Sequence, residues 1–144
     1  MLCDDSAAVR GALARVLEED PAIAVVARVG DGRQALAALD TAPPGQRAEV
    51  VLLDLEMPVM DGMTALPMIL RREPRPIVIV ASALTQKGAA ATLAALRAGA
   101  ADFLPKPTAG RGGLADPGFR AELLAKVKGW ARVGGRRERP PAAP

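Results

Sequence analysis

The stretch VVLLDLEMPVMDG, residues 50–62, decides the fold of this chain. Its first four residues are apolar and two of them are β-branched, which predicts a strand that is buried on both faces. The run stops at the carboxylate of Asp54. Ligands of open parallel sheets bind at the carboxyl ends of the strands, so Asp54 is a candidate for chemistry. The alternative is an Asp that only opens a turn, and this stretch alone does not separate the two interpretations.

The composition indicates one globular domain. The chain has 144 residues, of which 50% are hydrophobic and 24% charged, enough to bury a core of its own. No apolar run approaches the ~20 residues of a membrane span, and the sequence shows no basic segment followed by an apolar segment and a cleavage site. We therefore expect a cytoplasmic protein with no membrane association. Cys3, the single cysteine, cannot form an internal disulfide, and its apolar neighbours predict a buried thiol.

Positive charge collects at one end of the chain. The net charge is +3, but six basic residues and one acidic residue lie from position 126 onward, so residues 1–125 contain 13 basic and 15 acidic residues. Two Phe, one Trp and no Tyr leave no aromatic surface on which bases could stack. No helix-turn-helix or zinc-finger spacing is present. We therefore expect no nucleic-acid binding.

The chain contains no histidine. A Ser-His-Asp or Cys-His catalytic arrangement is impossible within these residues, and so are a phosphohistidine and a His-ligated zinc site. Any chemistry must therefore use carboxylates, hydroxyls and lysine.

A strand followed by a helix repeats five times along the chain. The repeat predicts an α/β fold, a doubly wound five-stranded parallel sheet with five helices on its two faces. Strand order 2-1-3-4-5 is the flavodoxin-like solution, and its switch point lies between strands 1 and 3. The expected strands are residues 1–3, 23–29, 50–53, 77–81 and 101–104.

Local signals predict several helix ends. Ser6 is a good N-cap for the first helix, and Gly99 is expected to end the fourth. Pro67 lies inside the third helical segment and removes a main-chain hydrogen bond. With Thr64 as N-cap the proline would fall in the first turn, so this helix is predicted to start late or to kink. The Asp-Pro pair at residues 116–117 predicts the start of the last helix.

The last part of the chain has three predicted segments. Residues 110–113 are a glycine-rich loop, and the helix that follows buries a stripe of Phe119, Leu123, Val127 and Trp130. From Gly134 the chain consists largely of Gly, Arg and Pro. We therefore divide it into a domain of residues 1–131 and a basic, proline-rich linker of residues 132–144, leading to an output domain outside this chain.

The predicted topology brings polar side chains from four strand ends together: Asp4 and Asp5, Asp54, Ser82 and Lys106. Crowded carboxylates repel one another unless a cation lies between them, and an all-oxygen cluster with open positions suits Mg²⁺. With the metal, the Lys106 ammonium and the Ser82 hydroxyl holding phosphoryl oxygens, one carboxylate could act as nucleophile. Asp54 is the candidate because it ends the central strand.

Each of these residues has an ordinary structural interpretation when it is taken singly. Asp4 and Asp5 could favour the start of the first helix, Ser82 could be a turn residue, and Lys106 a surface charge. Their coincidence at four strand ends favours the functional interpretation.

The same residues resemble a known family. The Asp pair at residues 4–5, LDLEMP at 53–58 with MDG at 60–62, Ser82 and Lys106-Pro107 resemble the receiver domain of bacterial two-component response regulators. The resemblance extends to about Trp130. ASALTQKG at residues 81–88, ALRAGA at 95–100 and ADF at 101–103 are similar, more narrowly, to the N-terminal domain of the chemotaxis protein-glutamate methylesterase.

The resemblance implies a role for each site residue. Asp54 would be the phosphoacceptor. Asp5 and Asp54 would bind Mg²⁺, with Asp4 acting through water and the main-chain oxygen of Glu56 as a further ligand. Ser82 and Lys106 would bind the phosphoryl group, and Phe103 would be the aromatic partner whose rotamer follows Ser82.

The resemblance also implies partners. A chemotaxis-type sensor histidine kinase would phosphorylate the domain, which would regulate a methylesterase and glutamine deamidase domain attached at its C-terminal side and so act on chemoreceptors indirectly. This chain itself would carry only self-phosphorylation and dephosphorylation chemistry. The alternatives are a stand-alone or transcriptional receiver, and a haloacid-dehalogenase-like phosphatase. The phosphatase would require an Asp where Glu56 stands.

Overall fold

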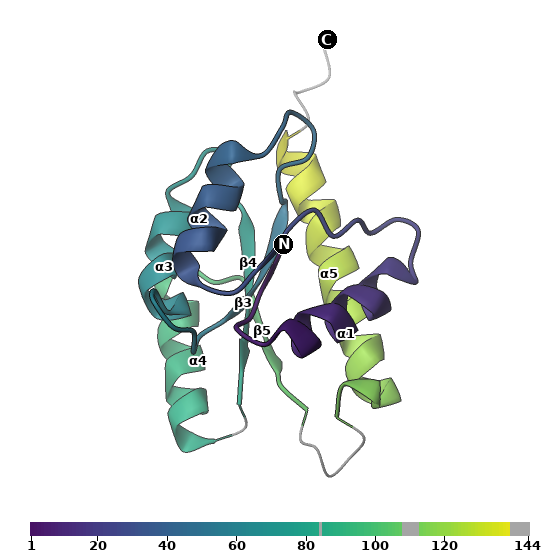
Figure 1. Ribbon diagram of the computed structural model, residues 1–144, viewed down its shortest axis with the longest axis vertical. Helices are drawn as coiled ribbons and strands as arrows, with labels where there is room; N and C mark the ends of the chain where they lie inside the picture. Colours follow the sequence, from purple (N-terminus) through teal and green to yellow (C-terminus); the bar gives the residue numbers. More distant parts are fainter. Residues whose placement is uncertain (84, 108–112, 139–144) are drawn as a thin grey trace.

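The computed structural model describes residues 1–83, 85–107 and 113–138, with side chains to residue 134. Strands and helices alternate along the chain (Figure 1). The strands are β1 (Leu2–Cys3), β2 (Arg28–Val29), β3 (Val50–Asp54), β4 (Ile77–Ser82) and β5 (Asp102–Pro105). The helices are α1 (Ala7–Glu18), α2 (Gly32–Thr41), α3 (Gly62–Leu70), α4 (Gln86–Ala98) and α5 (Pro117–Glu138), and a short 3-10 helix, η2 (Gly113–Ala115), precedes α5.

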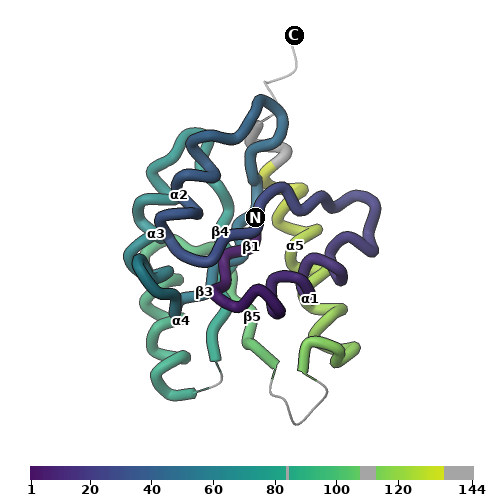
Figure 2. Tube along the Cα trace, in the orientation of Figure 1, coloured from purple at the N-terminus to yellow at the C-terminus, as the bar shows by residue number. Residues whose placement is uncertain are grey.

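The five strands form one parallel sheet in the order β2-β1-β3-β4-β5, as predicted. The longest pairing joins β3 to β4, from Val50 opposite Ile77 to Asp54 opposite Ala81. Figure 2 shows the short β1 lying against β3 near the centre of the molecule. Because all strands run in the same direction, their carboxyl ends meet at one edge of the sheet.

Two layers of helices cover the sheet. Helices α2, α3 and α4 lie on one face, and α1 and α5 on the other (Figure 1). Side chains of β3 alternate between the layers: Val51 and Leu53 face the first core, and Leu52 faces the second. Burial of each such aliphatic side chain contributes about 1.5–3 kcal/mol. The predicted buried stripe of α5 is confirmed, with Leu123 fully buried and Trp130 partly buried.

The second strand is shorter than the predicted residues 23–29. Only Arg28 and Val29 pair, opposite Leu2 and Cys3 of β1. β1 offers just these two residues, so an edge strand beside it cannot extend its ladder farther upstream. The β-branched residues that suggested a longer strand still pack against the core as half-buried side chains, among them Ile23 and Val25.

Of the two outcomes predicted for the third helix, the late start is wrong, and the kink at Pro67 stays a prediction. Helix α3 begins at Gly62, because Asp61 is its N-cap and accepts a hydrogen bond from the Thr64 N–H at 2.8 Å. Pro67 therefore lies inside the helix and not in its first turn. The proline is exposed to solvent, where water can bind the carbonyl group that its missing N–H leaves without a partner.

Helix α5 runs to Glu138 and so extends into residues that the sequence assigned to a linker. Its predicted start is confirmed, since Asp116 accepts a hydrogen bond from the Phe119 N–H at 3.0 Å. The rest of the predicted linker, residues 139–144, and most of the predicted glycine-rich loop, residues 108–112, lie outside the described part of the chain. The domain boundary at residue 131 stays a prediction. None of the described helices combines the length and apolar character that crossing a bilayer demands.

Gly62 allows α3 to begin in contact with the end of β3. A Cβ added at Gly62 would lie 2.3 Å from the main-chain oxygen of Asp54 and 2.8 Å from the Cα of Leu55. These are main-chain atoms at the end of β3 and just after it, so they cannot move aside as a flexible side chain could. The close approach also lets the Gly62 N–H donate to the Leu55 oxygen at 3.2 Å.

We predict that Gly62→Ala lowers the free energy of unfolding by about 3 kcal/mol, the upper part of the usual range for overpacking. Urea unfolding followed by circular dichroism measures the loss. Gly11→Ala in α1 is the matched control, because an added Cβ there meets no atom within 4 Å. Alanine should stabilise that helix position by up to about 1 kcal/mol. Equal midpoints for Gly62→Ala and the wild type would contradict the prediction.

Candidate functional site

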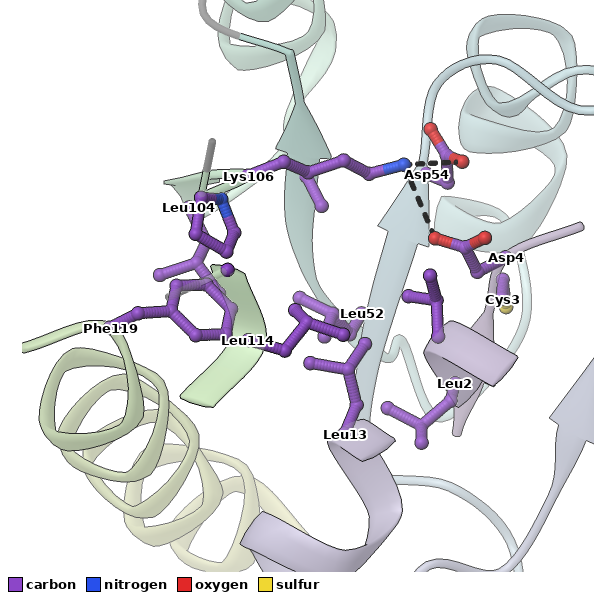
Figure 3. Close-up of a pocket in the computed structure, with 14 residues that line it drawn as sticks. Leu2, Cys3, Asp4, Leu13, Leu52, Asp54, Leu104, Lys106, Leu114 and Phe119 are labelled. Atoms are coloured by element: carbon purple, nitrogen blue, oxygen red, sulfur yellow. Dashed lines mark hydrogen bonds and ion pairs between the residues drawn. The ribbon is translucent and has the colours of Figure 1, made fainter. Parts of the chain in front are cut away.

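Three strand ends bring Asp4, Asp54 and Lys106 into contact. Asp4 follows β1, Asp54 ends β3, and Lys106 follows β5. The Lys106 Nζ lies 2.8 Å from Asp54 Oδ2 and 3.2 Å from Asp4 Oδ2 (Figure 3). The two carboxylates are almost completely buried, whereas the lysine side chain is 35% exposed. One ammonium therefore bridges two buried carboxylates that are fifty residues apart in the sequence.

Main-chain groups hold both carboxylates in position. Asp4 Oδ1 accepts the N–H of Ser6 at 2.9 Å, and Asp54 Oδ1 accepts the N–H of Glu56 at 3.0 Å. Each carboxylate therefore has one oxygen bound to the backbone and the other bound to Lys106. The guanidinium of Arg10 also donates to the main-chain oxygen of Asp4, which anchors α1 to the end of β1.

The site holds more negative than positive charge. One carboxylate oxygen from each of Asp4, Asp5 and Asp54 lies within 4.8 Å of the other two, and Asp5 is exposed. Burial raises the pKa of Asp54 above its usual value, and the hydrogen bond from Lys106 only partly opposes this effect. Burial lowers the pKa of Lys106, but Asp54 and Asp4 more than compensate, so that its pKa is raised. A single ammonium does not balance three carboxylates.

A hard divalent cation fits this donor set. The three ligand atoms are all carboxylate oxygens, two of the residues are fixed by the backbone, and the third reaches solvent. Mg²⁺ prefers such oxygen ligands and keeps waters in its remaining positions. Glu56 lies two residues after Asp54 in the sequence. It is exposed, and it lines the same hollow as Asp5. The predicted acidic cluster is therefore present.

Two hollows of different character flank the ion pair. An apolar cavity of about 220 Å³ lies on the side of α1 and α5, and Figure 3 shows its lining of Leu2, Leu13, Leu52, Leu104, Leu114 and Phe119. On the other side Asp54 and Lys106 meet a broad, open depression of about 720 Å³, lined also by Asp5, Glu56, Asp61 and Lys87. A polar reactant can therefore approach Asp54 from the open depression, whereas the lining on the other side of the ion pair is mostly apolar.

Ser82 ends β4 as predicted, and its hydroxyl binds a side chain of α4. Its Oγ lies 2.5 Å from Thr92 Oγ1 of α4, and Thr92 in turn donates to the main-chain oxygen of Gly88 at 2.9 Å. The sequence alone assigns Thr92 no role in the site. The sequence pattern that could have identified Thr92 is its position as a single polar residue, at helical spacing, between the small buried residues Gly88 and Ala95.

Phe103 lies on β5, the edge strand next to β4, with 41% of its surface exposed. Its ring points away from the core, because its strand neighbour Leu104 is the residue buried against α5. In the β4–β5 register Phe103 is opposite Val80, two residues before Ser82. Ser82 and Phe103 are therefore near neighbours on adjacent strands.

The chain matches known proteins in sequence and in fold. Residues 1–114 match the model of the response regulator receiver domain. The chain is 52% identical over 96% of its length to a protein-glutamate methylesterase/protein-glutamine glutaminase of Rhodospirillum rubrum, and 48% identical over 89% to that of Azospirillum brasilense. It covers 34% and 32% of those two proteins, so the chain spans about a third of the length of the curated relatives it matches.

Solved structures also resemble this chain in fold. The response regulator domain of Thermotoga maritima CheB is 33% identical, with a TM-score of 0.71 and 93% of each chain covered. The receiver domain of NtrX from Brucella abortus is 25% identical, with a TM-score of 0.69, and the comparison covers 91% of this chain and 96% of that one.

We predict that Lys106→Met lowers the free energy of unfolding at pH 7 by about 1–2 kcal/mol, less than for a fully buried pair because the lysine is partly exposed. Without the ammonium the pKa of Asp54 rises further. A group with a raised native pKa stabilises the fold below its unfolded pKa and loses that contribution as pH rises through the native pKa. The deficit should therefore shrink between pH 7 and pH 4, as measured by urea unfolding in EDTA.

Adding Asp54→Asn to Lys106→Met is the matched test of the cause. The double variant lacks the uncompensated carboxylate and should recover most of the lost stability at pH 7. A deficit that is independent of pH, or that the second substitution leaves unchanged, would show that the lysine acts through packing alone.

Proposed function

The chain belongs to the response regulator receiver domain family, and on that premise we propose that Asp54 accepts a phosphoryl group from a histidine kinase. The observation that carries the proposal is the buried Asp54 carboxylate, which Lys106 binds and which lines a broad, open depression. The family resemblance implies that the aspartate at the end of the third strand accepts the phosphoryl group. In this chain that aspartate is Asp54.

The contacts of Asp54 suit it to nucleophilic attack. The Glu56 N–H fixes the rotamer, and the second oxygen is available once Lys106 turns toward an incoming phosphoryl oxygen. An oxygen of Asp54 attacks phosphorus, the P–N bond to the kinase histidine breaks, and the departing imidazole keeps the electron pair and takes a proton from water. With a small acyl phosphate the P–O bond breaks and the carboxylate leaves.

We propose Mg²⁺ as the cofactor of this step. Asp5 and Asp54 would hold it directly, with the main-chain oxygen of Glu56, and Asp4 would act through a bound water. When bound, the ion neutralises phosphoryl charge that Lys106 alone cannot balance. The support for this assignment is the excess of carboxylates over cations in the described site.

Ser82 and Phe103 would report the phosphorylation. In the present structure the Ser82 hydroxyl binds Thr92, and Phe103 is exposed. A phosphoryl group on Asp54 would draw Ser82 away from Thr92, and Phe103 would move into the space that Ser82 leaves. New hydrogen bonds to phosphate would thus change the surface formed by α4, β5 and α5.

The proposed output is a protein-glutamate methylesterase and glutamine deamidase attached at the C-terminal side. The support is the pair of relatives that carry this activity in their names, of which this chain matches about a third. A chemotaxis histidine kinase would then be the donor, and the domain would act in the cytoplasm, where that kinase consumes ATP. Chemoreceptors would be affected indirectly, through their glutamyl and glutaminyl side chains.

We predict that the purified chain, incubated with Mg²⁺ and acetyl phosphate, gains the mass of one phosphoryl group, and that Asp54→Asn abolishes the gain. Intact-protein mass spectrometry measures both. Asp61→Asn is the matched control, because Asp61 lines the same depression and asparagine keeps its role as the N-cap of α3. Omitting Mg²⁺ in EDTA should reduce the rate at least tenfold.

Two results would contradict this prediction. One is a wild-type chain that stays unmodified in the presence of Mg²⁺. The other is steady release of phosphate from a phosphomonoester, since that would indicate a phosphatase and not a domain that is phosphorylated once.

The proposed output has its own test, which is to read the gene beyond codon 144. A hydrolase domain with a catalytic serine and histidine supports it. A basic helical domain or an immediate stop codon contradicts it and leaves the phosphoacceptor assignment of Asp54 untouched.

A further inference from the structure

A cluster of charged and polar residues joins β5 to α5 around Phe103, outside the phosphoacceptor site. It consists of Asp102, Glu122, Lys126 and Trp130, and we call it the β5–α5 cluster. The three residues from α5 are spaced four apart, so they lie on one face of the helix. Neither the family comparison nor the proposed chemistry of Asp54 gives this cluster a task.

Lys126 is at the centre of the cluster. Its Nζ lies 3.1 Å from Glu122 Oε1 and 3.3 Å from Asp102 Oδ1. Trp130 Nε1 donates to the other oxygen of Asp102 at 3.0 Å. Burial opposes ionisation of Asp102, but the bonds from Trp130 and the Phe103 N–H, together with the charge of Lys126, lower its pKa. The cluster is therefore a set of paired polar groups that fix the Lys126 side chain.

The fixed ammonium contacts Phe103 twice. It donates to the main-chain oxygen of Phe103, and it lies over the aromatic ring at 4.7 Å from the centroid. A cation at this distance is attracted to the face of a ring, most strongly where water is partly excluded. The Lys126 side chain is only 22% exposed, so this attraction is partly shielded from solvent.

The ring contact depends on the outward position of Phe103. If the ring turns toward Ser82, it leaves the ammonium, whereas the ion pairs of Lys126 with Asp102 and Glu122 involve no atom of the ring. The cation–π contact therefore differs between the two positions of Phe103. A contact that differs between two states shifts the equilibrium between them.

We propose that Lys126 is a positioning residue that holds Phe103 outward in the unphosphorylated domain and so opposes activation. The proposal rests on the phosphoacceptor function proposed for Asp54. Loss of the ammonium should move Phe103 toward the position it takes after phosphorylation. It should also tighten binding of a phosphoryl mimic by about threefold to tenfold, the range that one cation–π contact supplies.

The first measurement is fluorine NMR of the chain labelled with fluorophenylalanine and titrated with beryllofluoride in Mg²⁺. The chain has two phenylalanines, and the buried Phe119 is an internal reference. In Lys126→Met the Phe103 resonance should start nearer its beryllofluoride-bound position, and the apparent Kd should fall by about threefold to tenfold. Phe103→Leu assigns the resonances.

Two variants separate this role from a merely structural one. Lys126→Arg keeps a cation over the ring and should behave like the wild type. Lys128→Met removes the same charge from α5, but Lys128 pairs with Asp20 at 2.7 Å and not with Phe103, so it should change neither readout. In a Phe103→Leu background, Lys126→Met should have no further effect on the beryllofluoride Kd.

Three outcomes would overturn the proposal. The first is an unchanged Phe103 resonance and Kd in Lys126→Met, and the second is an equal change in Lys128→Met. The third is a wild type that binds no beryllofluoride at Asp54, which would overturn the proposed function as well. The first two leave that function standing, because the wild type still binds the mimic.

Discussion

The structure depends on a charge balance at the carboxyl edge of the sheet. Folding brings two buried carboxylates, Asp4 and Asp54, together beside the exposed Asp5, and Lys106 supplies one ammonium against them. Buried charges are tolerated only when they are paired and hydrogen-bonded, and here each carboxylate is completed by one main-chain N–H. The remaining negative charge favours a cation at this edge, and the cation proposed there would in turn favour the binding of phosphate.

The sheet explains why these residues meet. Asp54 and Lys106 lie at the ends of strands that flank β4, and Asp4 follows β1 on the other side of β3. Alternation along β3 buries aliphatic side chains against both helical layers and leaves its last residue at the edge. Gly62 then brings the start of α3 against the main chain of Asp54. The same strand therefore supplies aliphatic side chains to both cores and a carboxylate to the candidate site.

Much of this could be predicted from the sequence, because it depends on periodicity and on residues at element ends. Strand order, the acidic cluster and the caps at Ser6 and Asp116 belong to this part. The rest depends on partners that are distant in the sequence. The length of β2 is limited by β1, and the Ser82 hydroxyl is bound by Thr92 of the next helix. The start of α3 was predicted wrongly because Pro67 was given more weight than the cap at Asp61.

The central claim is that one ammonium does not balance the carboxylates of this site, so that a divalent cation completes it. The most direct measurement is the pKa of the Asp54 carboxyl, followed by carbon NMR with and without Mg²⁺. The account predicts a pKa above the usual Asp value of about 3.9 in EDTA, and a marked fall when Mg²⁺ is added. A pKa at or below the usual value in EDTA that Mg²⁺ does not change would contradict it.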